Sequence, residues 1–407
     1  MSQILAESNS GHQKGWKVIM AKYKKLALVT GAFSAVALLL SACATGPSTT
    51  GGSDEQVVVI GAVEMLTGSS AFYGQAVLSG IETAVDEINA DGGILGHTIE
   101  LKSYDNASDN AQTVTLVRRL ADDRSVPVII APTYQANFGA ACATATSIGI
   151  AVIGADSQPA PANQNTEGYC FSNAPDGEVQ VKQTLDGLHE RFDATRFGQI
   201  FDQQNAHQTL HNELGEEYVT TKQGWVLPVN AGVDTGQIDY STVISDMNRN
   251  NLDVVMVNLT TEDAARFISQ ARDLGLKALF SNASTSLVTE RLYELSNGAA
   301  EGLIVTTPQS ESDEGFAKFV TAFEQDHGPL PDPIAGYGYD AMMILKEAMV
   351  RAGTVSDRDA IRDALLQHED EFCPSICYKQ NAPGAFQTTK LVWLALTKDG
   401  FEALSSE

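Results

Sequence analysis

The sequence predicts an α/β fold made of two doubly wound units in series. Beyond about residue 55, short apolar runs of strand length alternate with segments whose apolar residues recur at helical spacing. Strands separated by helices in this way pair in parallel and are buried on both faces. The chain has 407 residues, a length that suggests two or more core-forming units. A loop rich in Pro, Asn and Gln at Ser157–Glu167 interrupts the alternation, which then resumes.

The first unit is expected to begin with the apolar run Val57–Val63 as a strand. The next apolar residues recur at helical spacing from Val77 to Ile88, and Asp91-Gly92-Gly93 is a typical helix end. The later predicted elements are a strand at Thr98–Tyr104, a helical face at Val114–Leu120, a strand of β-branched residues at Val126–Ala131, a helix of small residues at Ala136–Ser147 and a strand at Ile150–Ile153.

The second unit repeats the alternation, and the late elements could join either unit. The predicted helices are Val179–Arg191, Gln208–Tyr218, Tyr240–Asn248, Glu262–Leu274, Phe316–Gln325, Tyr339–Ala352 and Asp357–Gln367. The predicted strands are Phe197–Phe201, Gly224–Leu227, Asp253–Leu259, Ala278–Phe280, Leu303–Thr307 and Leu391–Thr397.

The loop Met65–Gln75 (MLTGSSAFYGQ) lies where sheets of this kind bind ligands, beyond the end of a strand and before a helix. It has the glycines of a phosphate-binding loop but lacks the Gly-Lys-Ser/Thr ending and any nearby lysine, so we do not expect a nucleotide. The small residues Gly68–Ala71 would let backbone amides approach a small solute. With two units, the expected site is the cleft between them.

Residues 1–43 are predicted to be a targeting segment rather than part of the fold. Three lysines at positions 22, 24 and 25 precede an apolar stretch of about fifteen residues, short for the roughly 20 that a spanning helix needs. The stretch ends in Leu40-Ser41-Ala42-Cys43, which resembles the lipobox of bacterial lipoproteins. We therefore expect cleavage before Cys43 and lipid attachment to it, with a short transmembrane anchor as the alternative. Residues 44–55 would form a flexible tether, and Met20 is a better start for such a signal than Met1.

The net charge of −25 and the absence of a basic stripe argue against nucleic-acid binding. Four cysteines lie beyond the signal, and an even number in an exported chain suggests disulfides. Of the three possible pairings, Cys373 and Cys377 are close enough for a local loop, which leaves Cys142 with Cys170. A metal site formed by two cysteines and His368 is the alternative, disfavoured because no second cysteine pair lies nearby.

Several stretches resemble one family in order. They are LTGSSAFYGQ, GIETAVDEINADGGILGHTIEL and YDNASDNAQTV, followed by AARFISQARDLGLKALF, AAEGLIVTTP and GYGYDAMMILKEAM. These are similar to the branched-chain amino-acid-binding proteins, the type I solute-binding proteins of ABC transporters. The similarity covers most of residues 57–352 and is weak beyond.

The resemblance implies two lobes joined by three crossovers, with the ligand cleft between them. The first lobe would hold residues 56–172 and 310–370, and the second 173–309 and 373–407. The crossovers would fall near Ser172, Pro308 and Phe372. The loop from Cys373 to Cys377 would then lie beside a hinge, where a local disulfide could limit the freedom of the chain.

The resemblance also assigns ligand-binding positions. In the first lobe, Tyr73 and Gly74 match the Tyr-Gly of the family, although Tyr73 could instead pack the helix start. Gln135 stands where the family has a ligand-binding Ser, and Asp156 and Gln158 stand where it has a small residue and Thr. Neighbouring candidates for contact are Ser69, Ser70, Tyr134 and Ser157.

The second lobe departs further from the family. Asp202 fits the expected strand end, but Ala206 and Thr260 replace ligand-facing aromatics, and Ser284 replaces the acidic residue that pairs with the substrate ammonium. A buried ammonium without an anionic partner costs several kcal/mol. Either Asp156 or Asp202 supplies the charge from a new position, or the ligand is not an α-amino acid but an amide, a urea-like solute or a carboxylate.

Two enzyme-like or metal-binding interpretations are weaker. His207 and His211 share a helix face, but the segment lacks the Glu that a zinc peptidase needs beside its first His, so a surface pair is the simpler interpretation. The carboxylates of Asp105, Asp109 and Asp122-Asp123 are expected to be solvated. No Gly-x-Ser-x-Gly elbow occurs, and we expect no enzyme, no cofactor and no bound metal.

The sequence therefore predicts a monomeric, lipid-anchored, extracytoplasmic solute-binding protein of an ABC importer. Its partners would be a small-molecule ligand, such as a branched-chain amino acid or a related amide, and the permease subunits. The alternative is a ligand-sensing lipoprotein of the same fold that acts on a receptor or regulator, because closure on a ligand serves either use.

Overall fold

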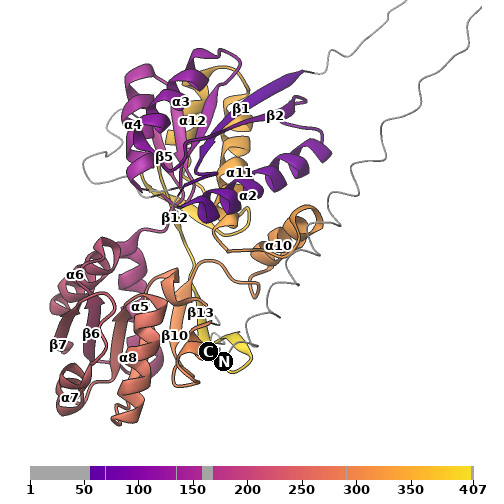
Figure 1. Ribbon diagram of the computed structural model, residues 1–407. Coiled ribbons are helices and arrows are strands. Elements are labelled where there is room, and N and C mark those ends of the chain that lie inside the picture. Colours follow the sequence, from indigo (N-terminus) through magenta and orange to yellow (C-terminus); the bar gives the residue numbers. More distant parts are fainter. Residues whose placement is uncertain (1–55, 69, 134, 158–167, 290, 405–407) are drawn as a thin grey trace, which may run out of the picture. The chain divides into compact units, whose positions relative to one another are not determined.

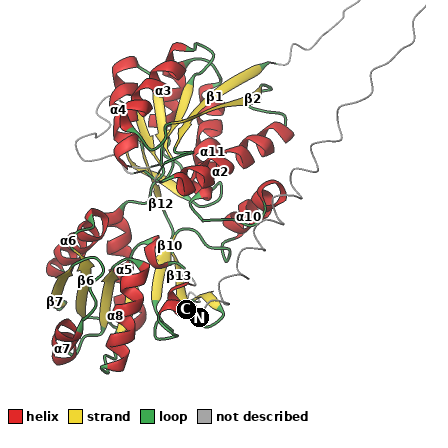
Figure 2. Ribbon diagram, in the orientation of Figure 1, coloured by secondary structure: helices red, strands yellow, loops and turns green. Residues whose placement is uncertain are grey.

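The computed structural model describes residues 56–68, 70–133, 135–157, 168–289 and 291–404. The described residues belong to one compact unit, residues 53–407. They form two seven-stranded sheets, each with helices against its faces (Figures 1 and 2). We call the first sheet with its helices the first lobe and the second sheet with its helices the second lobe.

The first sheet has the order β11-β12-β5-β4-β3-β1-β2. Its strands are β1 (Val57–Glu64), β2 (Thr98–Asp105), β3 (Val128–Ala131), β4 (Ala151–Gly154), β5 (Cys170–Ser172), β11 (Tyr378–Ala382) and β12 (Ala385–Thr388). Strands β1 to β5 are parallel, and the β11–β12 hairpin is joined to β5 by a parallel contact between Ala385 and Ser172. Every residue of β3 and β4 is buried, as expected for central strands covered on both faces.

Helices cover the two faces of the first sheet with separate apolar cores. One face packs against α2 (Ala71–Ala90), α10 (Glu314–His327), α11 (Ala335–Ala352) and α12 (Arg358–Leu366), and the other against α3 (Asn110–Asp122) and α4 (Gln135–Ile148). Figure 1 shows the orange α11 beside the indigo α2, although the two helices are far apart in the sequence.

The second sheet has the order β14-β13-β10-β9-β8-β6-β7. Its strands are β6 (Arg196–Asp202), β7 (Val226–Val233), β8 (Val254–Asn258), β9 (Leu279–Asn282), β10 (Ile304–Thr307), β13 (Val392–Thr397) and β14 (Gly400–Ala403). The last two strands are antiparallel additions. Its helices are α5 (Gly177–Phe192), α6 (Ala206–Thr221), α7 (Ser241–Arg249), α8 (Thr261–Asp273), the 3₁₀ turn η2 (Thr285–Leu287) and α9 (Arg291–Leu295).

Within the described residues the chain passes between the sheets at three places: after β5, after β10 and after β12. The first two agree with the crossovers expected near Ser172 and Pro308. The third was expected near Phe372 but follows Thr388, and the segment 373–388 assigned to the second lobe contributes β11 and β12 to the first sheet. The hairpin was missed because its strands are short and lack a sustained apolar run. The other lobe boundaries remain a prediction.

Two disulfides join the cysteine pairs expected from the sequence. Cys142 in α4 pairs with Cys170 in β5, across a separation of 28 residues. Cys373 pairs with Cys377 and closes a short loop before β11. Ser375, inside that loop, donates from its backbone N–H and its hydroxyl to the two carboxylate oxygens of Asp340 in α11, both at 2.7 Å.

The disulfide loop also contacts the third crossover. The backbone N–H of Thr389 donates to the carbonyl oxygen of Cys377 at 3.0 Å. Lys390, the next residue, pairs with Asp313 at the start of α10 at 3.0 Å, so the second and third crossovers are linked by an ion pair. The disulfide loop therefore lies beside a crossover, as expected. That crossover, however, follows Thr388 and does not lie near Phe372.

Helices α2 and α11 pack with their backbones in close approach at two glycines. A Cβ atom at Gly80 would lie 1.9 Å from the carbonyl oxygen of Ala335, and one at Gly338 would lie 2.2 Å from that of Val77. Both glycines are required because no side chain fits at these positions. This contact fixes the N-terminal half of α11, which carries Tyr337 of the cavity described below.

No helix in the described part of the chain has both the length and the apolar composition needed to cross a bilayer. The targeting segment and its Cys43 lie outside the described residues.

Candidate functional site

A cavity of about 310 Å³ is lined by residues from both lobes. The first lobe contributes Tyr73, Asp156, Asp332 and Tyr337 among others. The second lobe contributes Thr261, Ser286, Thr289 and Arg291, and the end of β10 adds Thr307 and Gln309. A volume of this size suits a small solute, and the polar side chains outnumber the apolar ones.

The loop segment of residues 65–68 is held by the carboxylate of Asp105, at the end of β2. Its Oδ1 accepts the backbone N–H groups of Leu66 and Thr67 at 3.0 and 3.1 Å, and its Oδ2 accepts the hydroxyl of Thr67 at 2.6 Å. A Cβ atom at Gly74 would lie 2.4 Å from the carbonyl oxygen of Met65, so glycine is required where α2 meets the loop. Asp105, expected to be solvated, instead organises the loop that precedes Tyr73.

Asp156 lies two residues beyond the end of β4 with a left-handed backbone, φ 54°. Non-glycine residues in this conformation are uncommon and concentrate at functional sites. The N–H of Asp156 donates to Oδ1 of Asn173, whose Nδ2 donates to the carbonyl oxygen of Tyr337. Asn173 therefore couples the position of Asp156 to the first turn of α11. Burial, followed by the nearby charge of Asp332, raises the pKa of Asp156 to about 7.

Two further groups of the first lobe face the cavity from the start of α11. Asp332 precedes the helix and accepts the N–H of Ile334 at 2.9 Å through one carboxylate oxygen. Burial raises the pKa of Asp332. Tyr337 is only 2% exposed, and its hydroxyl has no hydrogen-bond partner among the described residues. Burial and then the charges of Asp156, Asp340 and Asp332 raise the pKa of that hydroxyl well above its ordinary value.

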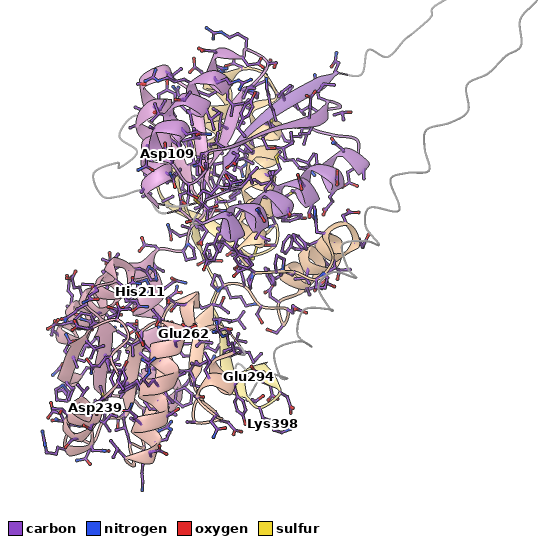
Figure 3. The ribbon with its side chains drawn as sticks, in the orientation of Figure 1. Asp109, His211, Asp239, Glu262, Glu294 and Lys398 are labelled. Atoms are coloured by element: carbon purple, nitrogen blue, oxygen red, sulfur yellow. A yellow bond between two sulfur atoms is a disulfide. The ribbon has the colours of Figure 1, made fainter. Side chains whose placement is uncertain are left out.

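The second-lobe wall is built from hydroxyl groups at helix starts. Thr260 caps α8 by accepting the N–H of Asp263 at 3.4 Å, and Thr261 lines the cavity beside it. Ser284 is buried and shares a 2.7 Å hydrogen bond with Ser286, which lines the cavity. Arg291 pairs with Glu262 at 3.1 Å, and Glu262 is labelled in Figure 3.

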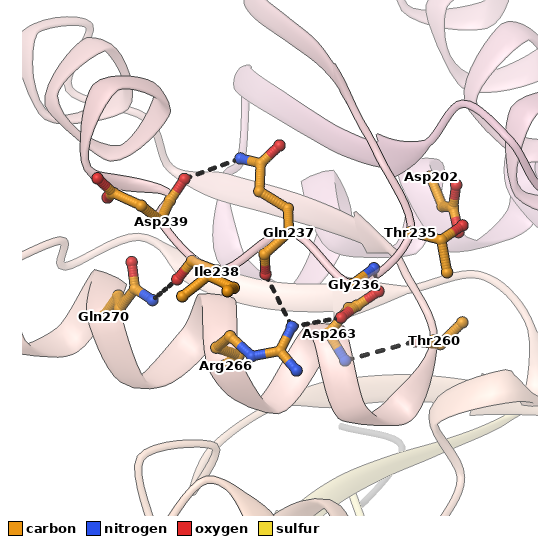
Figure 4. A network of polar contacts seen from close by, with 10 residues as sticks. All are labelled: Asp202, Thr235, Gly236, Gln237, Ile238, Asp239, Thr260, Asp263, Arg266 and Gln270. Atoms are coloured by element: carbon orange, nitrogen blue, oxygen red, sulfur yellow. Dashed lines mark hydrogen bonds and ion pairs between the residues drawn. The ribbon is translucent and has the colours of Figure 1, made fainter.

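Asp202 lies at the end of β6 as expected, but its carboxylate is engaged inside the second lobe. Oδ2 accepts the hydroxyl of Thr235 at 2.6 Å and Oδ1 accepts the N–H of Gln204 at 2.8 Å. Figure 4 shows Asp202 and Thr235 near the network that Asp263 and Arg266 form with the 236–239 loop. Asp202 is fully buried and does not line the cavity.

The structure thus brings two of the expected ligand-binding residues, Tyr73 and Asp156, to the cavity wall. The expected residues that do not line it are Ser70, Ser157, Asp202, Thr260 and Ser284. Ser69, Tyr134 and Gln158 lie outside the described residues, as does the side chain of Gln135. Ser157 is buried and donates its hydroxyl to the carbonyl oxygen of Pro132.

Sequence reasoning missed most of the second-lobe wall and the start of α11. The lining residues it missed include Thr261, Ser286, Arg291, Thr307, Gln309, Asp332 and Tyr337. A usable signal existed for two of them: Thr307 ends a predicted strand and Gln309 follows it. Thr261 and Ser286 are each within two residues of an expected position, an error that a small register shift in the second lobe produces.

His207 and His211 lie on one face of α6 with ring centroids 4.3 Å apart, and His211 is labelled in Figure 3. Across the described residues, no group of three His, Cys, Asp or Glu side chains is placed to hold a metal. Burial, with a smaller contribution from the neighbouring His207, lowers the pKa of His211 to about 3. The expected surface pair is therefore wrong for His211, whose imidazole is buried and neutral, although His207 is exposed.

The comparisons with known proteins agree with this arrangement. A family described as periplasmic binding protein matches residues 57–372. The leucine-specific-binding protein of Salmonella typhimurium is 25% identical over 317 residues, which cover 76% of this chain and 82% of the relative. The Leu/Ile/Val-binding protein homolog 1 of Brucella abortus is 27% identical over 313 residues, covering 75% and 81%.

Solved structures show the same fold. An ABC transporter substrate-binding protein from Sphaerobacter thermophilus has a TM-score of 0.72 at 20% identity, covering 86% of this chain and 97% of the other. A branched-chain amino acid transporter substrate-binding protein from Streptococcus pneumoniae, in complex with isoleucine, has a TM-score of 0.67 at 20% identity, covering 86% and 99%. The two-lobed α/β fold predicted from the sequence is therefore the type I fold of periplasmic binding proteins. Together with the matched residues 57–372, this shows that the chain belongs to the periplasmic binding protein family, a family of binding proteins and not of enzymes.

Proposed function

We propose that this protein is the extracytoplasmic solute-binding component of an ABC importer for branched-chain amino acids or closely related solutes. The observation that carries the proposal is the cavity of about 310 Å³, which takes polar residues from both lobes of a periplasmic-binding-protein fold. The relatives named leucine-specific-binding and Leu/Ile/Val-binding proteins support the ligand class.

The three crossovers are the points about which the lobes would move. A ligand that contacts residues of both lobes binds the closed arrangement more tightly than the open one, and it therefore shifts the population toward the closed arrangement. The closed, loaded protein would then dock on the permease and release the solute. Tyr73 and Asp156 would contact the solute from the first lobe, and Thr261 and Ser286 from the second.

The test is a thermal-shift screen on the protein from residue 54 onward. A ligand at 100 times its Kd stabilises the folded state by about 2.7 kcal/mol, whatever its chemistry. We expect leucine, isoleucine or valine to raise the melting temperature, with glucose and phosphate as unrelated solutes. If no branched-chain amino acid or amide produces a shift at millimolar concentration, the proposed ligand class is wrong.

We also propose that a lipid attached to Cys43 anchors the protein to the cell membrane. The protein would then lie on the periplasmic or outer face of that membrane. The support is the Leu-Ser-Ala-Cys quartet after a basic and apolar segment. Radiolabelled palmitate should label the full chain in a bacterial host, and Cys43→Ser should abolish both the label and membrane retention. Labelling that persists in Cys43→Ser would place the lipid elsewhere.

A further inference from the structure

We propose that the first-lobe wall of the cavity is a cation site, in which Asp156, Asp332 and Tyr337 bind the protonated amine of the solute. This inference rests on the proposed function and assigns the charge recognition within it. It answers which residue takes the place of the acidic side chain that Ser284 replaces. We call the three residues the Asp156 wall.

The first support is charge. In the described part of the chain, no Lys, Arg or His forms an ion pair with Asp156 or Asp332. Arg291 lines the same cavity, but it already pairs with Glu262 of the second lobe. Two half-buried carboxylates in one cavity repel each other, and each loses part of its hydration, so both effects cost free energy. A cation bound between the carboxylates offsets both effects.

The second support is the hydrogen-bond inventory. Tyr337 lines the cavity and is almost fully buried, and its hydroxyl has no partner among the described residues. An ammonium group has three N–H donors, and the Asp156 wall offers three acceptors: the two carboxylates and the phenolic oxygen. A buried hydroxyl without a hydrogen-bond partner costs free energy. A hydrogen bond donated by the ligand to the phenolic oxygen would remove that cost.

The third support gives the solute its orientation. Gln309 is 4% exposed and lines the cavity, and its Nε2 has no partner among the described residues. That amide is a donor, so it suits a carboxylate or carbonyl oxygen of the solute. A solute with an ammonium on the Asp156 wall and an acceptor toward Gln309 is an α-amino acid or an amino amide, rather than a plain carboxylate.

Asp202 is excluded as the anionic partner because both of its oxygens are occupied by Thr235 and Gln204 and it does not line the cavity. The backbone conformation of Asp156 supports Asp156, rather than Asp202, as the anionic partner. Its left-handed conformation is held by Asn173, which also bonds the carbonyl oxygen of Tyr337, so two members of the wall are positioned by one amide side chain.

The experiment is isothermal titration calorimetry at pH 8 with three probes of one shape. Leucine has both charges, isopentylamine lacks the carboxylate and 4-methylpentanoate lacks the ammonium. We expect leucine to bind most tightly, isopentylamine to bind more weakly and 4-methylpentanoate not to bind. Asp156→Asn should weaken leucine binding by about 10- to 150-fold, as expected for a lost charged hydrogen bond.

Asp86→Asn is the matched control, since it makes the same substitution at an exposed position of α2, in the same lobe but outside the cavity lining. The control should change the leucine Kd by less than about threefold. If the loss of any one negative charge were enough to weaken binding, Asp156→Asn and the control would weaken it equally. Asp332→Asn provides a second variant, and circular dichroism confirms that each protein is folded. Unchanged leucine affinity in both Asp156→Asn and Asp332→Asn, or binding of 4-methylpentanoate as tight as leucine, would overturn the cation site.

The outcomes also separate this inference from the proposed function. Binding of isopentylamine without binding of leucine, isoleucine or valine would retain the cation site and refute the branched-chain ligand class. Binding of leucine that is insensitive to both substitutions would retain the ligand class and refute the cation site. Binding of none of the branched-chain amino acids, their amides and isopentylamine refutes both.

Discussion

The close approach of α2 and α11 predicts that Gly80→Ala destabilises the protein. The added Cβ atom would lie 1.9 Å from the carbonyl oxygen of Ala335, against an ordinary contact of at least 3.4 Å. The obstacle is backbone, so no side-chain rotation relieves it. The two helices must separate by about 1.5 Å, or α11 must shift along its axis, and either change opens the core of the first lobe.

Two effects of opposite sign set the magnitude. Alanine is favoured over glycine inside a helix by about 1 kcal/mol. Overpacking of a close contact costs about 1–3 kcal/mol and more where backbone blocks backbone. With a clash this severe the packing cost is larger, and we expect a net loss of about 1–3 kcal/mol, which corresponds to a melting temperature lower by about 1–4 °C in a unit of this size.

The assay is a thermal melt by circular dichroism, with leucine titration as a second readout. Ser79→Ala, one residue earlier on the same helix, is the control and should leave the melting temperature unchanged or slightly raised. Because Asp332 and Tyr337 flank the displaced start of α11, Gly80→Ala should also weaken ligand binding. A Gly80→Ala protein that melts at or above the wild-type temperature would refute this account of the helix contact.

The remaining predictions concern pH and the disulfide. The raised pKa of Asp156, about 7 against 3.8 unfolded, means that the folded carboxyl holds its proton longer, so its contribution to stability falls as pH rises from about 4 to 7. Without ligand, Asp156→Asn should therefore be about 2 kcal/mol more stable than wild type at pH 8 and no more stable near pH 4, by urea unfolding. The pKa of His211 is lowered to about 3, so the unfolded state takes up a proton first as pH falls below 6.5. Protonation of the unfolded state therefore lowers the free energy of unfolding by about 2 kcal/mol at pH 5. The free energy of unfolding of His211→Gln should decline less steeply than that of the wild type between pH 6.5 and 4, and equal slopes for the two proteins would contradict this. Replacing Cys373 and Cys377 together by Ser should cost about 2 kcal/mol and weaken ligand affinity, whereas unchanged stability and affinity would refute a role for the loop beside the crossover.

The strands and helices that carry the two cores follow from local patterns. Val57–Glu64, Val128–Ala131 and Ala151–Gly154 are apolar runs bounded by turn residues, and the structure places them in the centre of the first sheet. The helix from Ala71 to Ala90 ends at Asp91-Gly92-Gly93 as expected. Periodicity identifies such elements because one buried face needs apolar residues at a fixed spacing.

Short and polar elements could not be predicted in this way. The hairpin Tyr378–Thr388 has no sustained apolar run, and its place in the first sheet depends on the free edge of β5. Helix α9, Arg291–Leu295, has five residues, too few to show a helical period. The third crossover was placed too early for the same reason, since its position is set by where the hairpin ends.

The cavity was predicted only in part. Tyr73 lies in a stretch that resembles the family and Asp156 follows the end of β4, and both line the cavity. Asp202 satisfies the same local rule, yet its oxygens are taken by Thr235 and Gln204. Which strand-end carboxylate faces a ligand depends on the hydrogen bonds around it, and these come from other segments.

The sequence by itself therefore determined the two α/β lobes, the family and the class of small-solute binding, because these depend on apolar periodicity and on local motifs. Only the tertiary structure decided which charges face the solute. Asp156 and Asp332 are 176 positions apart in the chain, and they line one cavity because β4 and the start of α11 meet at the same end of the first sheet. The charge balance of a cavity is a sum over neighbours in space, and no local pattern of residues contains that sum.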